Sequence, residues 1–528
     1  MKEHLFEDAY VTVTQGILHG TVEDGIKVFR GVPYAASPVG DRRWKAPLPP
    51  ARWFGVRKAD RFSAGAIQVD TRAGWKEDSF ELSADMDCED CLYLNLYTPA
   101  QTQEEKLPIL VWLHGGGMVA GTGMAPFFEG EKLAQQGIIV VTINYRLGLF
   151  GFLCHPELSA EAPQGTCGNY ALLDVMQALK WLQENAAQFG GDASRITVGG
   201  QSGGSVGASC ILMSPLAQGL CSQIIMDSGC PTMGGMMDAK PLADMEKDGA
   251  AFAEKIGCHS LAELRAMDGC DLMEACTREG YMANYCNDGY VLPADPKELL
   301  PNGRFNDMRF LVGFTTEEFG SLGCSPDLEI QPENFENYIR TVFPADMAPA
   351  MLEHYPHGTF DETRKSVLHV LSDLLFLSAV RLGAAAGEKG LPAFVYYKSR
   401  PDAGVRGQKL GSTHSSELPY LFGRPQPCAI NPAGMDQDER AFGRQLQNYW
   451  VNFVKNGTPN GKNVLVEWPQ CTKLFEYMDL GVHIHPATEE ETKVLKLLND
   501  LMDQRGETSV KPYMDTTSLN TPGFMRRR

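Results

Sequence analysis

Arg195-Ile-Thr-Val-Gly-Gly-Gln-Ser-Gly-Gly-Ser-Val-Gly207 is the most informative segment of this sequence. Its first four residues form a short β-branched run that is typical of a buried strand, and glycine-rich sequence ends the run abruptly. Residues 200–204 then have the G-x-S-x-G spacing of a nucleophile elbow, in which a strand turns sharply into a helix and presents the serine. Glycines two positions before and after the serine suit this turn because they carry no Cβ. The segment therefore predicts that Ser202 is a nucleophile.

The same spacing occurs a second time, around Ser205 in residues 203–207. Spacing alone is weak evidence: glycine accounts for 54 of the 528 residues, and a chain of this composition should contain about 0.3 chance matches. The distance from the strand separates the two serines. Ser202 follows the strand by one tight turn, whereas Ser205 would lie in the first turn of the helix, where packing or capping is its expected role.

The overall composition indicates a protein with a large core and an acidity that serves solubility. Of the 528 residues, 43% are hydrophobic, and the net charge of −19 argues against nucleic acid and against an anionic membrane as partners. The N-terminus lacks an apolar leader and no run of 18 apolar residues occurs, so we expect a cytoplasmic protein without a membrane span. The 14 cysteines include one C-x-x-C pair, Cys88 and Cys91. Without a second pair at zinc spacing, we expect free thiols, no metal site and no cofactor.

Apolar runs alternate with helical patterns along most of the chain, which predicts an α/β fold with a doubly wound, mostly parallel sheet. Residues 10–34 have the pattern of short antiparallel strands. We expect strands at 92–98, 107–113, 138–143, 195–198, 223–226, 310–314 and 393–397, helices at 125–136, 170–187 and 489–505, and mainly helical insertions at 240–300 and 325–390 that cover the sheet and the active site. The final helix is expected to pack on the core of its own chain, with a dimer contact as the alternative.

A nucleophilic serine needs a base and an acid that orients the base, and in α/β-hydrolases these follow the serine in the order acid, then histidine. Glu317 and Glu318 come directly after the apolar run 310–314. His414 lies among small residues before a helical stretch, as expected of a catalytic histidine on a loop. The residues predict the triad Ser202, one of the two glutamates, and His414.

The negative oxygen of a tetrahedral intermediate needs N–H donors that are already in place. Residues 115–117 are a glycine triplet directly after the strand predicted at 107–113, and glycine permits both positive φ and close backbone approach. The amide of Gly203, next to the nucleophile, is a further donor. The sequence therefore predicts an oxyanion hole built from this triplet and Gly203.

With these motifs in order, the chain resembles the type-B carboxylesterases, the family that includes the cholinesterases, and is most similar to the bacterial para-nitrobenzyl-esterase type. The resemblance implies one α/β-hydrolase domain over residues 1–528, the triad Ser202, Glu318 and His414, and an oxyanion hole from Gly116, Gly117 and Gly203. The segments that carry it are Phe29–Ala35, Glu89–Asn95, His114–Gly117, Asn144–Phe152, Gly168–Asn169, Leu172–Asp174, Trp181–Asp192, the elbow, Asp227–Gly229, the Glu318 and His414 segments, Tyr449–Phe453 and Trp468–Pro469.

The resemblance also ranks the two glutamates. Counting from Gly313 places the family's acid on Glu318, with Ser228 as a hydroxyl near it. Phe319 stands where the family usually has glycine, which keeps Glu317 as the alternative acid.

Several positions differ from the family pattern and bear on the substrate. The family's disulfide partner of Cys91 is absent, because no cysteine precedes Cys88. The position of the aromatic that grips quaternary ammonium in cholinesterases is Glu81, so a choline cage is not expected. Gln201 stands where the family often has glutamate, and Met118 where an aromatic is expected. Both are predicted to contact substrate, with Met118 as the soft wall of a broad acyl pocket.

The sequence thus predicts a metal-independent serine carboxylesterase that acts on small-molecule esters through an acyl-enzyme, as a monomer or homodimer. One alternative is a lipase, or another acyl hydrolase that acts on carbamates, amides or thioesters. A more distant alternative is a non-catalytic, cholinesterase-like binding module.

Overall fold

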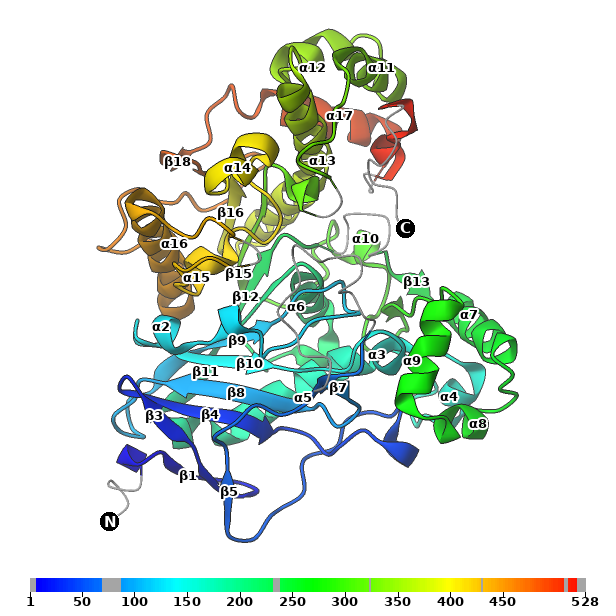
Figure 1. Ribbon diagram of the computed structural model, residues 1–528, viewed down its shortest axis with the longest axis vertical. Coiled ribbons are helices and arrows are strands. Elements are labelled where there is room, and N and C mark those ends of the chain that lie inside the picture. The colour runs from blue at the N-terminus through cyan, green and yellow to red at the C-terminus, as the bar shows by residue number, and fades with distance from the viewer. Residues whose placement is uncertain are drawn as a thin grey trace.

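The computed structural model describes residues 6–68, 87–230, 238–321, 324–428, 431–507 and 511–519, and a single large sheet dominates it (Figure 1). The sheet has 11 strands in the order β18-β17-β16-β15-β12-β11-β9-β10-β8-β4-β3. Their bounds are β3 Thr21–Glu23, β4 Ile26–Pro33, β8 Tyr93–Thr98, β9 Leu107–Leu113, β10 Ile139–Ile143, β11 Gly191–Gln201, β12 Gln223–Asp227, β15 Arg309–Thr315, β16 Ala393–Lys398, β17 Met478–Leu480 and β18 Ile484–Pro486.

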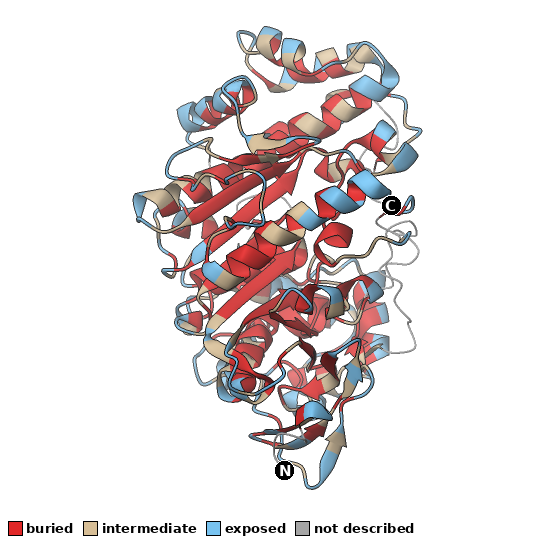
Figure 2. Cartoon of the chain, turned by 90° about the vertical axis from the view of Figure 1, so that its left-hand side faces the viewer, coloured by how far each residue is buried: buried red, intermediate tan, exposed pale blue. Residues whose placement is uncertain are grey.

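The seven neighbouring strands from β17 to β10 pair in parallel, and antiparallel pairs occur at the two sides of the sheet. The central strands are buried along most of their length (Figure 2). Burial on both faces explains why their sequences are continuous apolar runs instead of alternating patterns. The predicted α/β fold with a mostly parallel, doubly wound sheet is confirmed.

Strand β9 shows how the two faces of the sheet are covered. Ile109 and Val111 belong to the core that includes α5, α6 and α13, whereas Leu110 and Trp112 belong to the core that includes α2, α15 and α16. Successive side chains of a strand point to opposite faces, so one apolar run supplies both cores. The helices are α2 Glu131–Ala134, α3 Gly148–Phe152, α4 Pro156–Glu161, α5 Tyr170–Asn185, α6 Gly203–Met213, α7 Leu242–Lys255, α8 Leu261–Ala266, α9 Gly269–Arg278, α10 Pro296–Leu299, α11 Pro332–Val342, α12 Ala348–His354, α13 Phe360–Glu388, α14 Gly404–Leu410, α15 Leu418–Leu421, α16 Gln437–Asn456 and α17 Lys493–Arg505.

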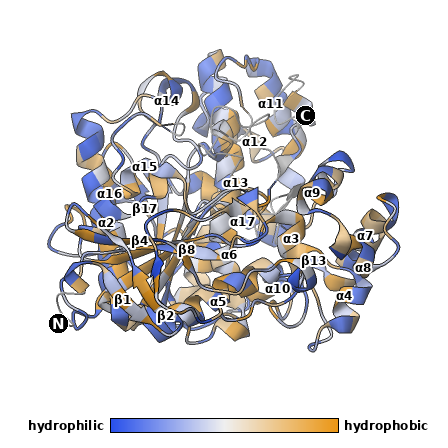
Figure 3. Cartoon of the chain, turned by 60° about the horizontal axis from the view of Figure 1, so that its bottom comes forward, coloured by the Kyte–Doolittle hydropathy of each residue, from blue (hydrophilic) through white to orange (hydrophobic). Residues whose placement is uncertain are grey.

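Helices α4, α7, α8 and α9 form a lobe at one side of the molecule (right in Figure 1), with an apolar core of its own. Outer helices such as α7 and α11 carry both hydrophilic and hydrophobic colours in Figure 3, as amphipathic surface helices do. The smaller sheets are β1-β2-β5, β6-β7 and β13-β14, with bounds β1 Tyr10–Val13, β2 Gly16–His19, β5 Val56–Lys58, β6 Gly65–Ala66, β7 Asp87–Cys88, β13 Lys240–Pro241 and β14 Cys286–Asn287.

Helix α13 is the one helix in the described ranges that is long and apolar enough to span a membrane, but 83% of its most apolar window is buried inside the protein. It contacts β15, β16 and α17. It is therefore a core helix that lies directly on the sheet. Helix α17 packs on the same core, as predicted for the C-terminal helix.

Two predicted helices differ from the structure. In place of a helix over 125–136, there is a 3-10 turn at Pro126–Phe128 and the short helix α2, because Pro126 and Gly130 interrupt the pattern. The C-terminal helix begins at Lys493 instead of 489. Glu81, the position of the cholinesterase aromatic, lies outside the described residues.

Candidate active site

Ser202 lies at the junction of β11 and α6 in a backbone conformation that is rare for a residue other than glycine. Its φ is 57° and its ψ is −123°, and it is the residue just before the first turn of α6. Its amide donates to Asp227 O at 2.9 Å, which anchors the turn to the end of β12. This is the geometry of a nucleophile elbow.

The glycines on either side of Ser202 are required by packing. A Cβ added at Gly200 would lie 2.4 Å from the carbonyl of Gly204, and a Cβ at Gly204 would lie 2.1 Å from Leu113 O. Ser205 is fully buried in α6, where its Oγ donates to Gly229 O at 2.5 Å. The second serine therefore has a packing contact, as its position in the sequence predicted.

The glycine triplet after β9 lies against the start of α6. Gly116 and Gly117 have φ values of 107° and 62°. A Cβ at Gly203 would lie 2.8 Å from Gly117 N and 2.6 Å from Met118 N, so the loop amides adjoin the residue after Ser202. Within the described part of the chain, the amides of Gly116, Gly117 and Gly203 donate no hydrogen bond to the protein. Their N–H groups are therefore available to a ligand oxygen.

Glu318 and His414 contact each other through the imidazole Nδ1 and Glu318 Oε2. Both are buried, Glu318 in the turn after β15 and His414 in the loop between α14 and α15. Glu318 Oε1 also accepts hydrogen bonds from Ser228 Oγ (2.7 Å) and Thr315 N (2.6 Å). Although burial alone would raise the pKa of Glu318, His414 and these donors lower it below its usual value. The carboxylate thus stays ionised beside the imidazole.

Glu317, the alternative acid, has different partners. Its Oε2 accepts from Thr316 Oγ1 at 2.7 Å and from Ser412 N at 2.6 Å, while its Oε1 lies 3.7 Å from His369 Nδ1. Burial raises the pKa of Glu317. Of the two glutamates, Glu318 is the one that contacts His414.

Gln201 brings the end of β11 to the other side of His414. Its side chain is fully buried, and its Nε2 lies 3.1 Å from His414 Nε2. Because Nδ1 of the imidazole faces a carboxylate, the neutral ring carries its proton there, and the Nε2 lone pair accepts from the Gln201 amide. Ser202 is the next residue in the chain, so this contact brings His414 beside the segment that carries Ser202.

Met118, the other residue predicted to contact substrate, is 2% exposed and has a positive φ of 61°. Its carbonyl accepts from Gly148 N at 2.8 Å, and its Cε lies 3.5 Å from where a Cβ on Gly207 would be. The side chain therefore points towards α6 and forms part of the wall behind the glycine loop.

Two further carboxyl groups are buried near the triad residues. Asp227 accepts from Tyr396 Oη (2.8 Å) and Trp450 Nε1 (3.3 Å), and burial raises its pKa to about 7. Burial also raises the pKa of Glu417 to about 8, with the charges of Asp227 and Glu318 acting in the same direction. Asp227 belongs to a segment that carries the family resemblance, and Glu417 lies three residues after His414. Neither sequence pattern indicates whether these carboxyl groups are protonated.

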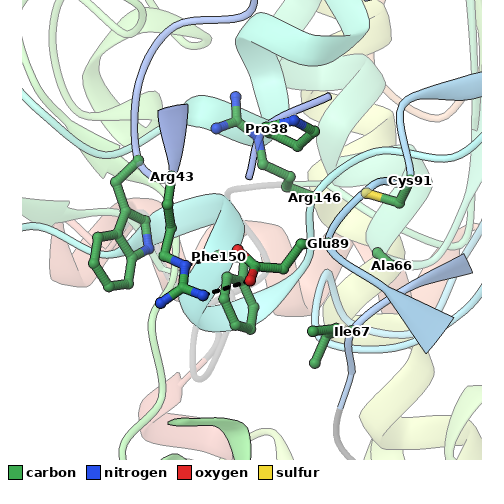
Figure 4. Close-up of a pocket in the computed structure, with 9 residues that line it drawn as sticks. Pro38, Arg43, Ala66, Ile67, Glu89, Cys91, Arg146 and Phe150 are labelled. Atoms are coloured by element: carbon green, nitrogen blue, oxygen red, sulfur yellow. Dashed lines mark hydrogen bonds and ion pairs between the residues drawn. The ribbon is translucent and has the colours of Figure 1, made fainter. Parts of the chain in front are cut away.

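A small pocket lies beside Cys91, and Ser202, Glu318 and His414 are not among the residues that line it (Figure 4). The Arg43–Glu89 ion pair borders this pocket, and Arg146 lines it as well. Cys91 is a free, buried thiol, as the absence of an upstream cysteine predicted. Burial raises its pKa well above the usual value, which makes the thiol unreactive.

One group of side chains in the described ranges has the spacing of a metal site: Asp479, His485 and Glu491. The His485 Nε2 lies 3.0 Å from Glu491 Oε1, whereas its Nδ1 faces Asp479 at 3.8 Å. The two ring nitrogens point to different carboxylates, so the group is accounted for as a surface ion-pair cluster at β17 and β18.

The chain is similar in sequence and in fold to known esterases. The model of the Carboxylesterase family matches residues 7–496. The chain is 32% identical to fumonisin B1 esterase of Sphingopyxis macrogoltabida, over 88% of this chain and 85% of that protein, and 30% identical to carboxylesterase 1C of Mus musculus, over 92% and 91%. Among solved structures, a carboxylesterase of Geobacillus stearothermophilus has a TM-score of 0.78 at 27% identity, over 93% of this chain and 99% of that chain.

Proposed function

The chain belongs to the carboxylesterase family and is a carboxylic ester hydrolase, and we propose that it cleaves small-molecule esters through an acyl-enzyme formed on Ser202. His414 acts as the general base and Glu318 as the acid that orients it. A serine hydroxyl is a poor nucleophile until a base accepts its proton, so the three residues act as a unit.

The proposed reaction starts when His414 Nε2 accepts the hydroxyl proton of Ser202. The serine oxygen attacks the ester carbonyl, and Glu318 stabilises the imidazolium that forms. The alcohol leaves with the proton from His414, and water, deprotonated by the same imidazole, then releases the acid. The amides of Gly116, Gly117 and Gly203 bind the negative oxygen in both steps.

One observation carries this proposal: both nitrogens of the His414 ring are engaged by the segments that the mechanism requires. Nδ1 contacts Glu318, and Nε2 contacts Gln201, the residue before Ser202. The segments of Gln201, Glu318 and His414, which are distant in sequence, therefore meet at one imidazole. The loop of Gly116 and Gly117, whose amides are available to a ligand oxygen, lies next to them.

We propose the substrate class from the residues of the same site. Met118 and the glycine loop offer an apolar wall, which suits uncharged acyl groups, and a lipase or an amide, carbamate or thioester hydrolase would use the same residues. Rates on a series of p-nitrophenyl esters of increasing acyl length, and on matched amide and thioester substrates, distinguish these possibilities. We also propose a cytoplasmic, reducing setting, because buried cysteines such as Cys91, Cys154 and Cys286 are free thiols in the structure.

Ser202→Ala tests the proposal directly. We expect kcat on p-nitrophenyl butyrate to fall by at least about 10⁴-fold, because the nucleophile is lost. A fluorophosphonate probe should label the parent protein and not the variant.

Ser205→Ala is the matched control, since it removes the serine of the second G-x-S-x-G match. Its Oγ donates to Gly229 O, away from His414 and Glu318, so kcat per labelled molecule should stay within about tenfold of the parent value. Parental activity in the Ser202 variant, or loss of labelling only in the Ser205 variant, would contradict the assignment.

A further inference from the structure

Lys398 is a fully buried lysine at the end of a central strand, close to the acid of the candidate triad. It is the last residue of β16 and pairs with Thr315, three residues before Glu318. A buried ammonium is costly unless every N–H is satisfied and opposite charge lies nearby. The partners of Lys398 therefore indicate what it does.

The Lys398 ammonium has three N–H groups, and each has an acceptor. Two are the hydroxyls of Ser412 and Ser416, both at 2.9 Å, and the third is Arg400 O at 3.0 Å. The two serines lie two residues before and two residues after His414. One charged group thus holds the histidine loop on both sides of the base.

Two carboxylates hold the backbone of the same loop. Asp402 Oδ1 accepts from Thr413 N at 3.1 Å, and Asp402 Oδ2 accepts from the Thr413 hydroxyl. Glu317 Oε2 accepts from Ser412 N at 2.6 Å. Asp402 Oδ1 also lies 3.8 Å from Lys398 Nζ. We call Lys398, Asp402 and Glu317 the clamp of the His414 loop, and it is an ionic network as well as a set of hydrogen bonds.

Packing alone does not account for a charge at this depth. Burial lowers the pKa of Lys398, while the charge of Asp402 acts in the opposite direction. Buried ion pairs can often be replaced by apolar residues with little loss of stability. An apolar side chain at position 398 would also fill the space under the loop, but it would leave Ser412 and Ser416 without their shared donor.

We infer that Lys398 is a positioning residue for ester hydrolysis: it fixes loop 412–416 so that His414 keeps Nδ1 on Glu318 and Nε2 towards Ser202. The inference rests on the proposed role of His414. Proton transfer depends steeply on geometry, and a displacement of 1 Å can cost about a hundredfold in rate. The clamp therefore acts on the rate of the chemical steps.

Two variants and one control test the inference. Lys398→Met removes the donors and keeps an unbranched side chain. The double variant Ser412→Ala with Ser416→Ala keeps the lysine and removes two of its acceptors. Lys27→Met is the matched control, because Lys27 is 3% exposed and donates to Ala100 O at 2.7 Å from strand β4, on the far side of the sheet.

The readouts separate positioning from misfolding. The end point of fluorophosphonate labelling counts competent active sites, whereas kcat and the labelling rate constant report the chemistry in each site. For Lys398→Met and for the double variant, we expect a parental end point, KM within about threefold, and a fall of about tenfold to a hundredfold in kcat and in the labelling rate. Lys27→Met should keep both rates within about twofold.

The double variant decides the question if Lys398→Met does not fold. Parental rates per labelled site in the double variant would overturn the inference, and so would a loss confined to the labelling end point. If the parent protein itself neither labels nor hydrolyses esters, the proposed function fails and this inference fails with it. Active variants alongside an active parent overturn the inference alone.

Discussion

At the scale of single residues, Ser202 has a strained backbone conformation that a hydrogen bond and close packing hold in place. Its φ of 57° lies where an L-residue other than glycine is disfavoured by about 1–3 kcal/mol. The hydrogen bond from its amide to Asp227 O and the close approach of Gly200 to Gly204 hold it there. The strain is located at the residue that we propose as the nucleophile.

Gln201→Glu should shift the pH dependence of catalysis upwards. The Gln201 amide now donates to the lone pair of His414 Nε2, which favours the neutral ring. A carboxylate at this position would favour the imidazolium instead, so the base would lose its proton only at higher pH. We expect the rise of kcat/KM with pH to move up by about one unit.

Gln201→Met is the control for this prediction, because it removes the amide without adding charge. Its profile should stay closer to that of the parent than the profile of the glutamate variant. A Gln201→Glu profile that coincides with that of the parent, with chemistry limiting the rate, would show that residue 201 does not act on the base.

The choice between Glu317 and Glu318 shows where sequence reasoning ends at this scale. Both follow the same strand, and a pattern of residues does not say which of two neighbours turns inward. The direction is set by the 3-10 turn that starts at Glu318 and by donors from distant segments, such as Ser228 and Ser412. Counting from Gly313 ranked Glu318 first, and the structure places that residue on His414.

At the scale of elements, the buried strands were predictable and the contacts between loops were not. The apolar run at 107–113 coincides with β9, because burial on both faces leaves a continuous signal. Strands β17 and β18 have three residues each, too few for any period to appear. Lys398 ends an ordinary strand, and its contacts with Ser412 and Ser416 depend on how the loop after α14 folds back.

Gly116→Ala tests the loop after β9 as an oxyanion-binding element. Gly116 has a φ of 107°, and a Cβ there would lie 2.2 Å from Ala120 O. The substitution should displace the loop amides and lower kcat by about 10²- to 10³-fold, the scale of losing one oxyanion donor. Gly165→Ala imposes a similarly positive φ, 69°, with nothing within 4 Å. A kcat in Gly116→Ala no lower than in Gly165→Ala would contradict the assignment.

At the scale of the whole molecule, the parallel register of four strands assembles the site. Strands β11, β12, β15 and β16 are neighbours in the sheet, and they end at Gln201, Asp227, Thr315 and Lys398 respectively. Parallel strands bring their carboxyl ends to one edge, where open α/β sheets bind ligands. The positions of Ser202, Glu318, Lys398 and the buried carboxyls therefore follow from one topology.

The buried carboxyl groups at this edge of the sheet make the folding stability depend on pH. Glu417 is 1% exposed, and in the described part of the chain neither of its carboxyl oxygens has a hydrogen-bond partner. Burial raises its pKa to about 8, and that of Asp227 to about 7. Between roughly pH 4 and 8 the folded protein retains protons that the unfolded chain releases, so these groups make the free energy of unfolding fall as pH rises.

Glu417→Gln should remove the Glu417 part of this dependence, because an amide is neutral at every pH. We expect the variant to exceed the parent by about 1–3 kcal/mol at pH 8, less than the full pKa shift implies because the site relaxes, and to match it near pH 4.5. Thermal unfolding at pH 5 and pH 8 measures this difference, with Glu184→Gln on the exposed face of α5 as the control that should show none. Equal melting temperatures of parent and Glu417→Gln at pH 8 would mean that Glu417 is ionised in the folded protein, with the buried ammonium of Lys398 as the positive charge that compensates it.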